Sequence, residues 1–400
     1  MNHLLFTLAI LGVFTLLNAY ISRRFIAHLD IHLKYKRVFR LFLYFNLLGI
    51  FLYILARYYT NVPNWLYFLL SLPIGVIFLF FSTAIIYDVS RVTLFKLPMS
   101  HNRRNFFKRS LDITALATAS AVTLKAIDNA RYVELQKVNI QIKNLKKSYK
   151  IVQISDLHIG GLINKAFMKN IVTRVNATEP DIVVITGDLV DTSIGNAKEA
   201  LEELKLLQSK YGTFYIVGNH EYFHGIKEII EYVKSLGIRV LENENVYIGK
   251  NGEGFNLAGV YDVFGYRKGN FMPNITRALN GKKDAPTVLL AHQPRFIEEV
   301  KEGVDLVLSG HTHGGQLYPF KFLVQIVQPY ISGLHQHNEN LQIYVNKGTG
   351  YWGPPMRLGA SAEITEIELI PKYSKNQYSM MIFNENNQIL KDIFEKEKLQ

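Results

Sequence analysis

The sequence predicts an α/β domain preceded by a region of membrane-spanning helices. The first third of the chain contains three long apolar stretches without a charged side chain, which is typical of transmembrane helices. The remaining two thirds contain short apolar runs separated by helical patterns. Short apolar runs that alternate with helices are typical of strands and helices in an α/β fold.

The length of 400 residues allows two or three domains with a buried core. The chain has no cysteine, which excludes disulfides, thiol nucleophiles, zinc–thiolate sites and iron–sulfur clusters. We expect a membrane region at 1–128, a globular domain at 129–370 and a polar tail at 371–400.

The apolar stretches of the membrane region are apolar on all sides, whereas a helix on the surface of a soluble protein would have one polar face. About 20 apolar residues span the hydrocarbon core of a bilayer. Transmembrane helices are therefore expected at about 4–21, 39–57 and 62–87, with a weaker fourth segment at 111–127.

Basic residues are concentrated in the membrane region. Residues 1–128 contain 14 Lys and Arg against 4 Asp and Glu, whereas the rest of the chain is nearly neutral. Most of the basic side chains lie in two segments, 23–37 and 91–109, and short basic loops mark the cytoplasmic side of a membrane. We therefore expect the amino terminus and the globular domain to lie outside the cytoplasm. The near neutrality of the globular domain argues against nucleic acid as a partner.

A short motif precedes the weaker fourth segment. Asn102–Lys108 contains two arginines, two phenylalanines and a lysine, and it resembles a twin-arginine export signal. The alternative is that Arg103 and Arg104 simply flank a permanent membrane anchor. The small residues at 119–121 leave open whether this segment is cleaved.

The globular domain is predicted to begin with a strand at Tyr132–Ile142. Shorter strands are expected at 151–154, 182–185, 214–217, 288–290, 306–308 and 343–345. Helices are expected at 165–175, 197–209 and 226–236, the last of which ends at Gly237. Gly249–Gly254 is expected to form a turn between two strands.

Polar side chains follow five of these strands. The clusters are Asp156 and His158; Asp188 and Asp191; Asn219, His220 and Glu221; His292; and His311 and His313. Ligands of open α/β sheets collect beyond the carboxyl ends of the strands, so these loops could meet in one concavity. Carboxylate, imidazole and amide ligands without thiolate suit Mn²⁺, Fe or Zn²⁺. Seven candidate ligands exceed the needs of one ion, whereas two ions that share a carboxylate would use them all, as in phosphoryl-transfer centres.

These five motifs, in this order, resemble the signature of the calcineurin-like metallophosphoesterases. The run His311–Gln316 and the segment Gly348–Arg357 are similar to the bacterial branch that is membrane-linked or exported by the twin-arginine route. That branch usually has a proline where this chain has Ala360–Ala362. The resemblance implies an α/β/β/α sandwich in the globular domain and a hydrolase of phosphate esters.

The resemblance also implies roles for individual residues. Asp156, His158 and His313 would hold a first divalent metal ion, Asn219, His292 and His311 would hold a second, and Asp188 would bridge the two, which together activate a hydroxide. His220 would donate a proton to the leaving group or stabilise its developing charge, and Asp191 and Glu221 would orient the ligands or His220. Asp191 could instead be an ordinary helix cap.

Three further features have two interpretations each. Arg357 is expected either to contact a substrate phosphate or to be an ordinary surface residue. His224, His335 and His337 match no ligand of the family and are expected in solvated loops. The apolar segment Leu317–Ile331 is expected to form a membrane-facing lip or, as we favour, to pack under the sheet.

The predicted function is that of a multi-pass membrane phosphoesterase with an extracytoplasmic catalytic domain. Its expected substrate is a phosphodiester, pyrophosphate or phosphomonoester of a lipid or other membrane or envelope component. The alternatives are a phosphodiesterase of soluble nucleotides, a protein phosphatase, and a non-catalytic metal-binding sensor or scaffold. The sequence does not indicate an oligomeric state.

Overall fold

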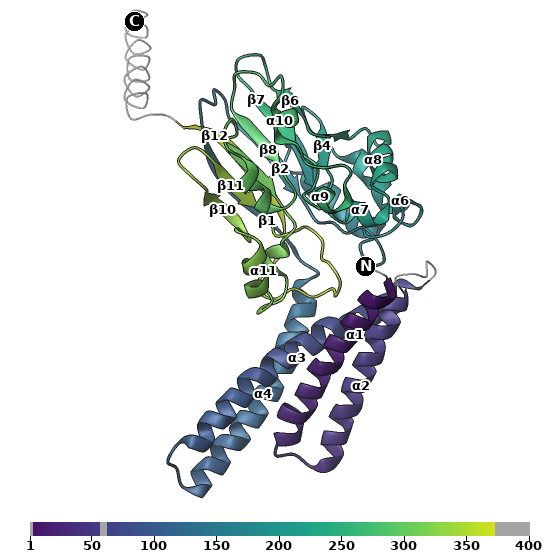
Figure 1. Cartoon of the computed structure of the whole chain (residues 1–400), viewed down its shortest axis with the longest axis vertical. Coiled ribbons are helices and arrows are strands. Elements are labelled where there is room, and N and C mark those ends of the chain that lie inside the picture. The colour runs from purple at the N-terminus through teal and green to yellow at the C-terminus, as the bar shows by residue number, and fades with distance from the viewer. Residues whose placement is uncertain (1–2, 57–61, 373–400) are drawn as a thin grey trace, which may run out of the picture.

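The computed structural model describes residues 3–56 and 62–372. Much of the tail predicted at 371–400, and most of the loop that joins the second and third predicted membrane helices, lie outside the described residues. The described chain forms a helical membrane region and an α/β domain, which meet at one end of the helices (Figure 1).

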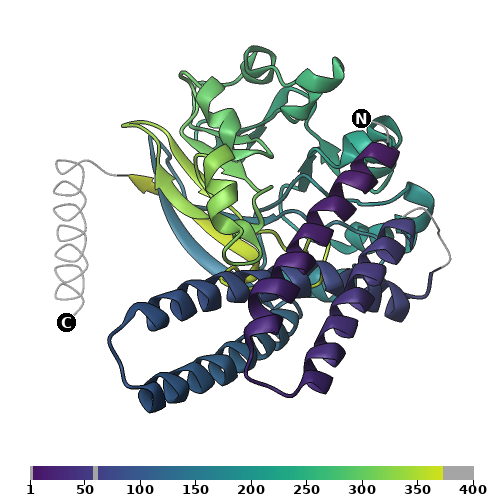
Figure 2. The same cartoon turned by 60° about the horizontal axis from the view of Figure 1, so that its bottom comes forward.

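The membrane region contains four helices within the described residues that are long and apolar enough to cross a membrane. They are α1 (His3–Tyr20), α2 (Leu33–Ala56), α3 (Asn64–Lys96) and α4 (His101–Asn129); a π-helical turn at Ile21–Phe25 and a 3₁₀ turn at Ile26–His28 follow α1. The helices run alternately toward and away from the α/β domain, and α3 and α4 form a long hairpin (Figure 2).

The helices extend further than the apolar stretches predicted. Helix α2 begins six residues earlier, at Leu33, and α4 begins at His101, so the twin-arginine motif forms its first turns. Helix α3 continues to Lys96 and includes Pro73, which packs against Gly49 of α2. The reason is that charged side chains at the ends of a transmembrane helix can reach water and need not interrupt the helix.

The α/β domain is a sandwich of two sheets, each six-stranded within the described residues. The first has the order β1–β12–β2–β3–β4–β5 and consists of β1 (Val133–Lys143), β12 (Ala362–Lys372), β2 (Tyr149–Ile154), β3 (Ile182–Thr186), β4 (Thr213–Ile216) and β5 (Arg239–Val240). Strands β2 to β5 are parallel, and β12 pairs antiparallel with β2.

The second sheet has the order β10–β11–β9–β8–β7–β6. It consists of β10 (Gly333–Gln336), β11 (Gln342–Val345), β9 (Leu306–Ser309), β8 (Thr287–Leu290), β7 (Phe255–Gly259) and β6 (Glu244–Ile248). Strands β7, β8, β9 and β11 are parallel, and the predicted turn at Gly249–Gly254 joins the antiparallel pair β6 and β7.

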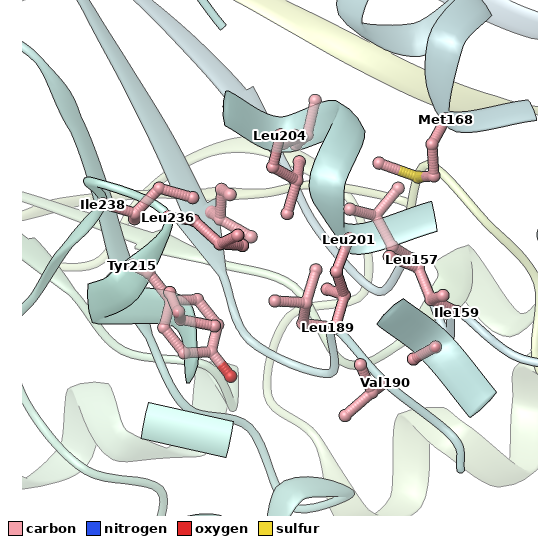
Figure 3. Packing of buried hydrophobic residues seen from close by; sticks show 14 of the residues in the cluster. Leu157, Ile159, Met168, Leu189, Val190, Leu201, Leu204, Tyr215, Leu236 and Ile238 are labelled. Carbon is pink, nitrogen blue, oxygen red and sulfur yellow. The ribbon is translucent and has the colours of Figure 1, made fainter. Parts of the chain in front are cut away.

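Helices cover the outer faces of both sheets, which confirms the predicted α/β/β/α sandwich. They are α5 (Lys165–Asn176), α6 (Ile194–Leu201), α7 (Glu221–His224), α8 (Ile226–Ser235), α9 (Phe264–Lys268), α10 (Ile275–Leu279) and α11 (Lys321–Val327), with 3₁₀ turns at Glu202–Leu206, Pro294–Glu299 and His313–Gly315. Figure 3 shows one layer of the core, where Leu189, Leu201 and Leu204 pack together under the first sheet.

The continuous apolar sequence of the central strands explains their position. Every residue of β3 is buried, because one face of the strand contacts the outer helices and the other contacts the second sheet. The parallel strands of both sheets therefore form a rigid double layer, and the loops at their carboxyl ends lie side by side. Five of these loops carry the predicted site.

Candidate metal centre

The predicted ligands come together at the carboxyl ends of five parallel strands. Asp156 and His158 follow β2, Asp188 and Asp191 follow β3, and Asn219, His220 and Glu221 follow β4 in the first sheet; His292 follows β8, and His311 and His313 follow β9 in the second. Both sheets thus contribute to a single cluster, as the positions of the motifs after the strands predicted.

The backbone of the cluster is strained. Five of the seven predicted ligands, namely Asp156, His158, Asp188, His311 and His313, have φ between 49° and 71°. This left-handed region costs a residue other than glycine about 1–3 kcal/mol and is often retained at functional sites. Gly310 lies close to the same loops, because a Cβ atom there would be 2.3 Å from an Asp156 carboxylate oxygen.

Asp156, His158 and His313 form a first group that could hold a metal ion, since their ligand atoms all lie within 4.8 Å of one another. The Nε2 atoms of the two histidines are 3.0 Å apart, and His313 Nε2 is 3.6 Å from Asp156 Oδ1. All three side chains are buried. The two Nε2 atoms therefore point toward a common position.

Asp188, His292 and His311 form a second such group. His292 Nε2 lies 3.2 Å from Asp188 Oδ2 and 3.3 Å from Asn219 Oδ1. The other ring nitrogen, Nδ1, is 2.7 Å from the carbonyl oxygen of Thr186. Because that carbonyl accepts a hydrogen bond from Nδ1, Nε2 is the ring nitrogen that can bind a metal ion once its own proton is released.

Asp188 lies between the two groups. Its Oδ2 atom is 3.2 Å from His292 Nε2 in one group and 3.9 Å from His158 Nε2 in the other. Glu221 supports this position from behind, because its buried carboxylate accepts hydrogen bonds from the backbone amides of Asp188 and Leu189 at 3.1 and 2.8 Å. Glu221 therefore fixes the backbone of the loop after β3, in keeping with the first of the two roles expected for it, the orientation of a ligand.

His220 lies beside Asn219 with its ring toward the cluster. Its Nδ1 atom pairs with Asp191 Oδ1, and its Nε2 atom lies 3.9 Å from Asp188 Oδ2. Burial lowers the pKa of His220, but the carboxylates of Asp188 and Asp191 outweigh it and raise the pKa to about 9. Asp191 thus holds the ring, and it is not the ordinary helix cap that the sequence also allowed. Asp191 also belongs to a third possible ligand group, with His158 and His220.

The electrostatics of the cluster fit metal ligands. Burial alone would raise the pKa of Asp188, but the neighbouring His292 and His220 hold it well below its usual value. Burial, together with the charge of His292, lowers the pKa of His311 to about 3, and burial also lowers the pKa of His313. Burial would lower the pKa of His292, but the charge of Asp188 outweighs it and raises this pKa well above its usual value, and burial raises the pKa of Asp156. Carboxylate, imidazole and amide groups without thiolate are a donor set for two hard or borderline divalent cations.

Arg357 is neither exposed to a substrate phosphate nor an ordinary surface residue, the two alternatives that the sequence predicted. It is fully buried, and its guanidinium group donates to the backbone carbonyls of Lys347 at 3.0 Å and Gly350 at 2.5 Å. Its Nη2 atom also lies 3.2 Å from His313 Nδ1. The side chain therefore has no exposed surface for a substrate phosphate, and it positions the loop and ring of His313 instead. The carbonyl-rich loop 347–350 replaces water as its partner.

The structure also shows the positions of the three remaining histidines and of the apolar segment Leu317–Ile331. His224 Nε2 lies 3.7 Å from Asp191 Oδ1, so this histidine is closer to the site than the sequence suggested. His335 and His337 lie away from the cluster against Tyr330. The favoured interpretation of Leu317–Ile331 was wrong for α11, none of whose side chains is buried. The buried residues of the segment are Leu317, Gln328 and Ile331.

Sequence reasoning missed two kinds of residues around the cluster. Trp352 and Phe223 face the ring of His220, at centroid distances of 5.9 and 6.0 Å. Tyr53 and Tyr67 of the membrane helices line a cavity that also contacts His158 and Asp191. Phe223 lies close to His220 in the sequence, but no motif marks it. Trp352, Tyr53 and Tyr67 come from segments far from the ligands that they approach.

The sandwich and the paired ligand groups define a two-metal phosphoesterase. A family model described as calcineurin-like phosphoesterase matches residues 149–315. The chain is 41% identical over 320 residues to an uncharacterized metallophosphoesterase of Helicobacter pylori, a match that covers 79% of this chain and 85% of that protein. It is 33% identical over 377 residues to an uncharacterized metallophosphoesterase of Campylobacter jejuni, covering 92% and 99% of the two chains. The chain belongs to the calcineurin-like metallophosphoesterases.

A further relative supports the combination of the two regions. The chain is 39% identical over 236 residues to a bovine (Bos taurus) transmembrane protein with metallophosphoesterase domain, which covers 56% of this chain and 53% of that protein. The protein is therefore a membrane-associated hydrolase of phosphate esters that uses two divalent metal ions.

Proposed function

We propose that this enzyme hydrolyses a phosphate ester carried by a membrane or envelope component, at the extracytoplasmic face of the membrane. One observation carries the proposal: the loop that follows His158 packs directly on a membrane helix. A Cβ atom at Gly161 would lie 2.7 Å from Cε1 of Tyr67 in α3, so the glycine allows a close approach of the loop to the ring. The site thus lies beside the membrane helices, where membrane substrates are concentrated.

The domain is fixed to the helices by further contacts. Met356 and Leu317 of the domain pack with Leu79 of α3 and Ala126 of α4. The backbone amide of Arg357 donates to the carbonyl of Ala126 at 2.8 Å. The same residue that positions His313 is therefore bound to a membrane helix, which gives the metal site a fixed orientation toward the bilayer.

Helix α11 favours contact of the domain with lipid. Phe322, Leu323 and Ile326 are 52%, 56% and 78% exposed, and Phe320 contacts Phe78 of α3 at a centroid distance of 6.1 Å. Exposed apolar side chains that continue the surface of a transmembrane helix are suited to the hydrocarbon or interfacial layer. This agrees with the membrane-facing lip that the sequence allowed.

The proposed orientation of the protein in the membrane is supported by the basic residues at one end of the helices. The basic segments lie together at the end remote from the α/β domain, where Lys108 of α4 donates to the carbonyl of His28 after α1. Because basic loops remain cytoplasmic, we assign the opposite end, with the catalytic domain, to the extracytoplasmic side. A reporter fused after Gln400 tests this: it should be active only outside the cytoplasm, and activity inside would reverse the assignment.

The chain supplies the groups that the reaction needs. Two bound divalent cations would provide Lewis-acid polarisation of the phosphoryl oxygens and of water. Asp156, His158 and His313 would hold one cation, Asn219, His292 and His311 would hold the other, and Asp188 lies where it would contact both. His220, held by Asp191, would donate its proton to the leaving oxygen of the substrate.

The test compares membrane and soluble esters. The full-length protein in detergent, loaded with Mn²⁺, should hydrolyse bis-p-nitrophenyl phosphate and should have a higher kcat/KM for phospholipid esters than for nucleotide esters. The Asp188→Asn variant controls for contaminating phosphatases. A preference for nucleotides or phosphopeptides would contradict the membrane substrate, and full metal occupancy without any turnover would favour a non-catalytic scaffold.

A further inference from the structure

A cavity of about 310 Å³ joins the metal-ligand cluster to the membrane helices. His158 and Asp191 form the part of its lining that belongs to the cluster. The loop Gly160–Lys165 and the start of α6 form one side, and the ends of α2 and α3 form another. The membrane region is therefore a wall of the active site as well as an anchor.

The cavity lies at the level expected for lipid headgroups. Tyr67, in its wall, precedes Asp88 by 21 residues of α3, and Asp88 pairs with Arg24 and Arg91 at the basic end of the helices. Twenty-one residues correspond to about 32 Å of helix, which is close to the roughly 30 Å thickness of the hydrocarbon core. A ligand in the cavity would therefore lie near the opposite membrane surface, beside the metal site.

The lining of the cavity contains aromatic rings and amide groups, and its formal charge is only −1, from Lys165, Asp191 and Glu199. Tyr53, Tyr67 and Tyr351 contribute rings with hydroxyl groups, and the rings of Tyr53 and Tyr67 are 5.2 Å apart. Asn64 and Asn196 contribute amide groups, which both donate and accept hydrogen bonds. The lining also contains one cation, Lys165, and one further anion, Glu199. Tyrosine and asparagine together suit a carbon skeleton that carries hydroxyl groups.

We propose that this cavity is the binding subsite for an uncharged, hydroxyl-bearing headgroup, such as glycerol, inositol or a sugar, of a lipid phosphodiester whose phosphate lies at the metal centre. The inference rests on the proposed function and names the class of its substrate. The volume of the cavity is at the lower end of the range for small-molecule sites, which fits one headgroup and excludes a folded peptide segment.

Competition between matched lipids tests the proposal. The full-length protein in detergent, loaded with Mn²⁺, is assayed on bis-p-nitrophenyl phosphate in the presence of phosphatidylglycerol, phosphatidylinositol or phosphatidylethanol. The three lipids have the same acyl chains and the same single negative charge, and phosphatidylethanol lacks headgroup hydroxyls. We expect at least one hydroxylated lipid to inhibit about tenfold more strongly than phosphatidylethanol, which corresponds to one or two hydrogen bonds.

The variants Asn64→Ala, Asn196→Ala and Tyr67→Phe should each reduce this ratio at least threefold. Asn139→Ala on exposed β1 and Tyr44→Phe on the lipid-facing side of α2 are the matched controls, which should preserve it. Equal inhibition by all three lipids, or an unchanged ratio in the variants, would overturn the proposal. So would stronger inhibition by phosphatidylcholine, which would indicate a cationic headgroup. Failure of the proposed function is distinguishable, because it would appear without any competing lipid, either as absent hydrolysis of bis-p-nitrophenyl phosphate or as a preference for nucleotide or phosphopeptide esters in the direct assay.

Discussion

Buried carboxylates occur in two regions of this protein, and their partners differ. At the basic end of the membrane helices, Asp88 and Asp112 are paired with arginine and lysine. In the catalytic domain, the ion pairs of Asp156 and Asp188 among the described residues are all with histidines. The first arrangement carries its own positive charge, whereas the second depends on added cations.

In the ion pairs of the membrane region, the charge of the carboxylate is compensated by side chains of the protein itself. Asp112 is 4% exposed, and its carboxylate accepts hydrogen bonds from Lys108 Nζ and the hydroxyl of Tyr87, each at 2.7 Å, and from the amide of Asp30 at 2.6 Å. These bonds join α3 and α4 to the turn after α1. A buried carboxylate with a lysine and two further donors has a structural role, because its charge is compensated in the fold itself.

The catalytic carboxylates have only histidines as compensating partners, and the carboxylates raise the pKa of His220 and His292. Histidines that serve as metal ligands are neutral, and burial favours the neutral ring of His311 and His313. A histidine that binds a cation gives up its proton, so the charge of Asp156 and Asp188 would then be compensated by the two cations. The kind of partner, rather than burial itself, therefore distinguishes a functional carboxylate from a structural one in this protein.

The largest effect is expected for Asp188→Asn. This variant is close in shape but removes the charge that lies between the two ligand groups, so we expect turnover to fall at least about 1000-fold, or about 4 kcal/mol of transition-state stabilisation. Bound metal should fall as well, as measured by elemental analysis of the folded protein. Asp284→Asn, in an exposed loop, is the control. Turnover with full metal content would contradict the bridging position.

A smaller effect is expected for His220→Gln. The variant removes the proton donor but none of the seven proposed ligands, so turnover should fall about 100-fold while metal content remains nearly unchanged. His335→Gln, an exposed histidine away from the cluster, is the matched control. Loss of the metal in His220→Gln would instead make His220 a ligand, as its place in the third possible ligand group allows.

The sequence predicted the catalytic carboxylates better than the membrane ones. Asp156 and Asp188 follow uninterrupted apolar strands, and parallel strands bring the residues that follow them to one edge. The pairing of Asp112 with Tyr87 joins two helices whose rotation no local pattern specifies. Likewise, β12 was not predicted, because it lies between β1 and β2 and its partners are more than 200 residues away.

Arg357 shows the same limit inside the catalytic domain. The motif around it was recognised, but whether an arginine contacts substrate or backbone depends on loop packing. Here the carbonyls of Lys347 and Gly350 enclose the guanidinium group, and the amide of Arg357 binds α4. Such long-range contacts have no periodic signal in the sequence. The aromatic wall formed by Tyr53 and Tyr67 was missed for the same reason.

The membrane side of the comparison is tested by Asp112→Asn. Removal of this carboxylate leaves Lys108, whose side chain is 15% exposed, without its partner, so the free energy of unfolding should fall by about 2–3 kcal/mol. Hydrolysis of bis-p-nitrophenyl phosphate should remain within about twofold of the wild type at a temperature where the variant is folded. Reversible unfolding in mixed micelles measures the first quantity. A loss of turnover without a loss of stability would contradict the structural role of Asp112 and show that this ion pair affects catalysis.

The smallest effect is expected for Asp30→Asn at the same end of the helices. Asp30 Oδ2 pairs with Arg109 Nε at 3.0 Å, but the two side chains are 56% and 73% exposed. Water and salt already solvate both charges, so the pair should contribute less than about 0.5 kcal/mol to the free energy of unfolding. The same unfolding measurement should therefore separate Asp30→Asn clearly from Asp112→Asn. If both variants lost equal stability, burial and the additional donors around Asp112 would not explain its role, and the distinction between compensated and uncompensated carboxylates would need another basis.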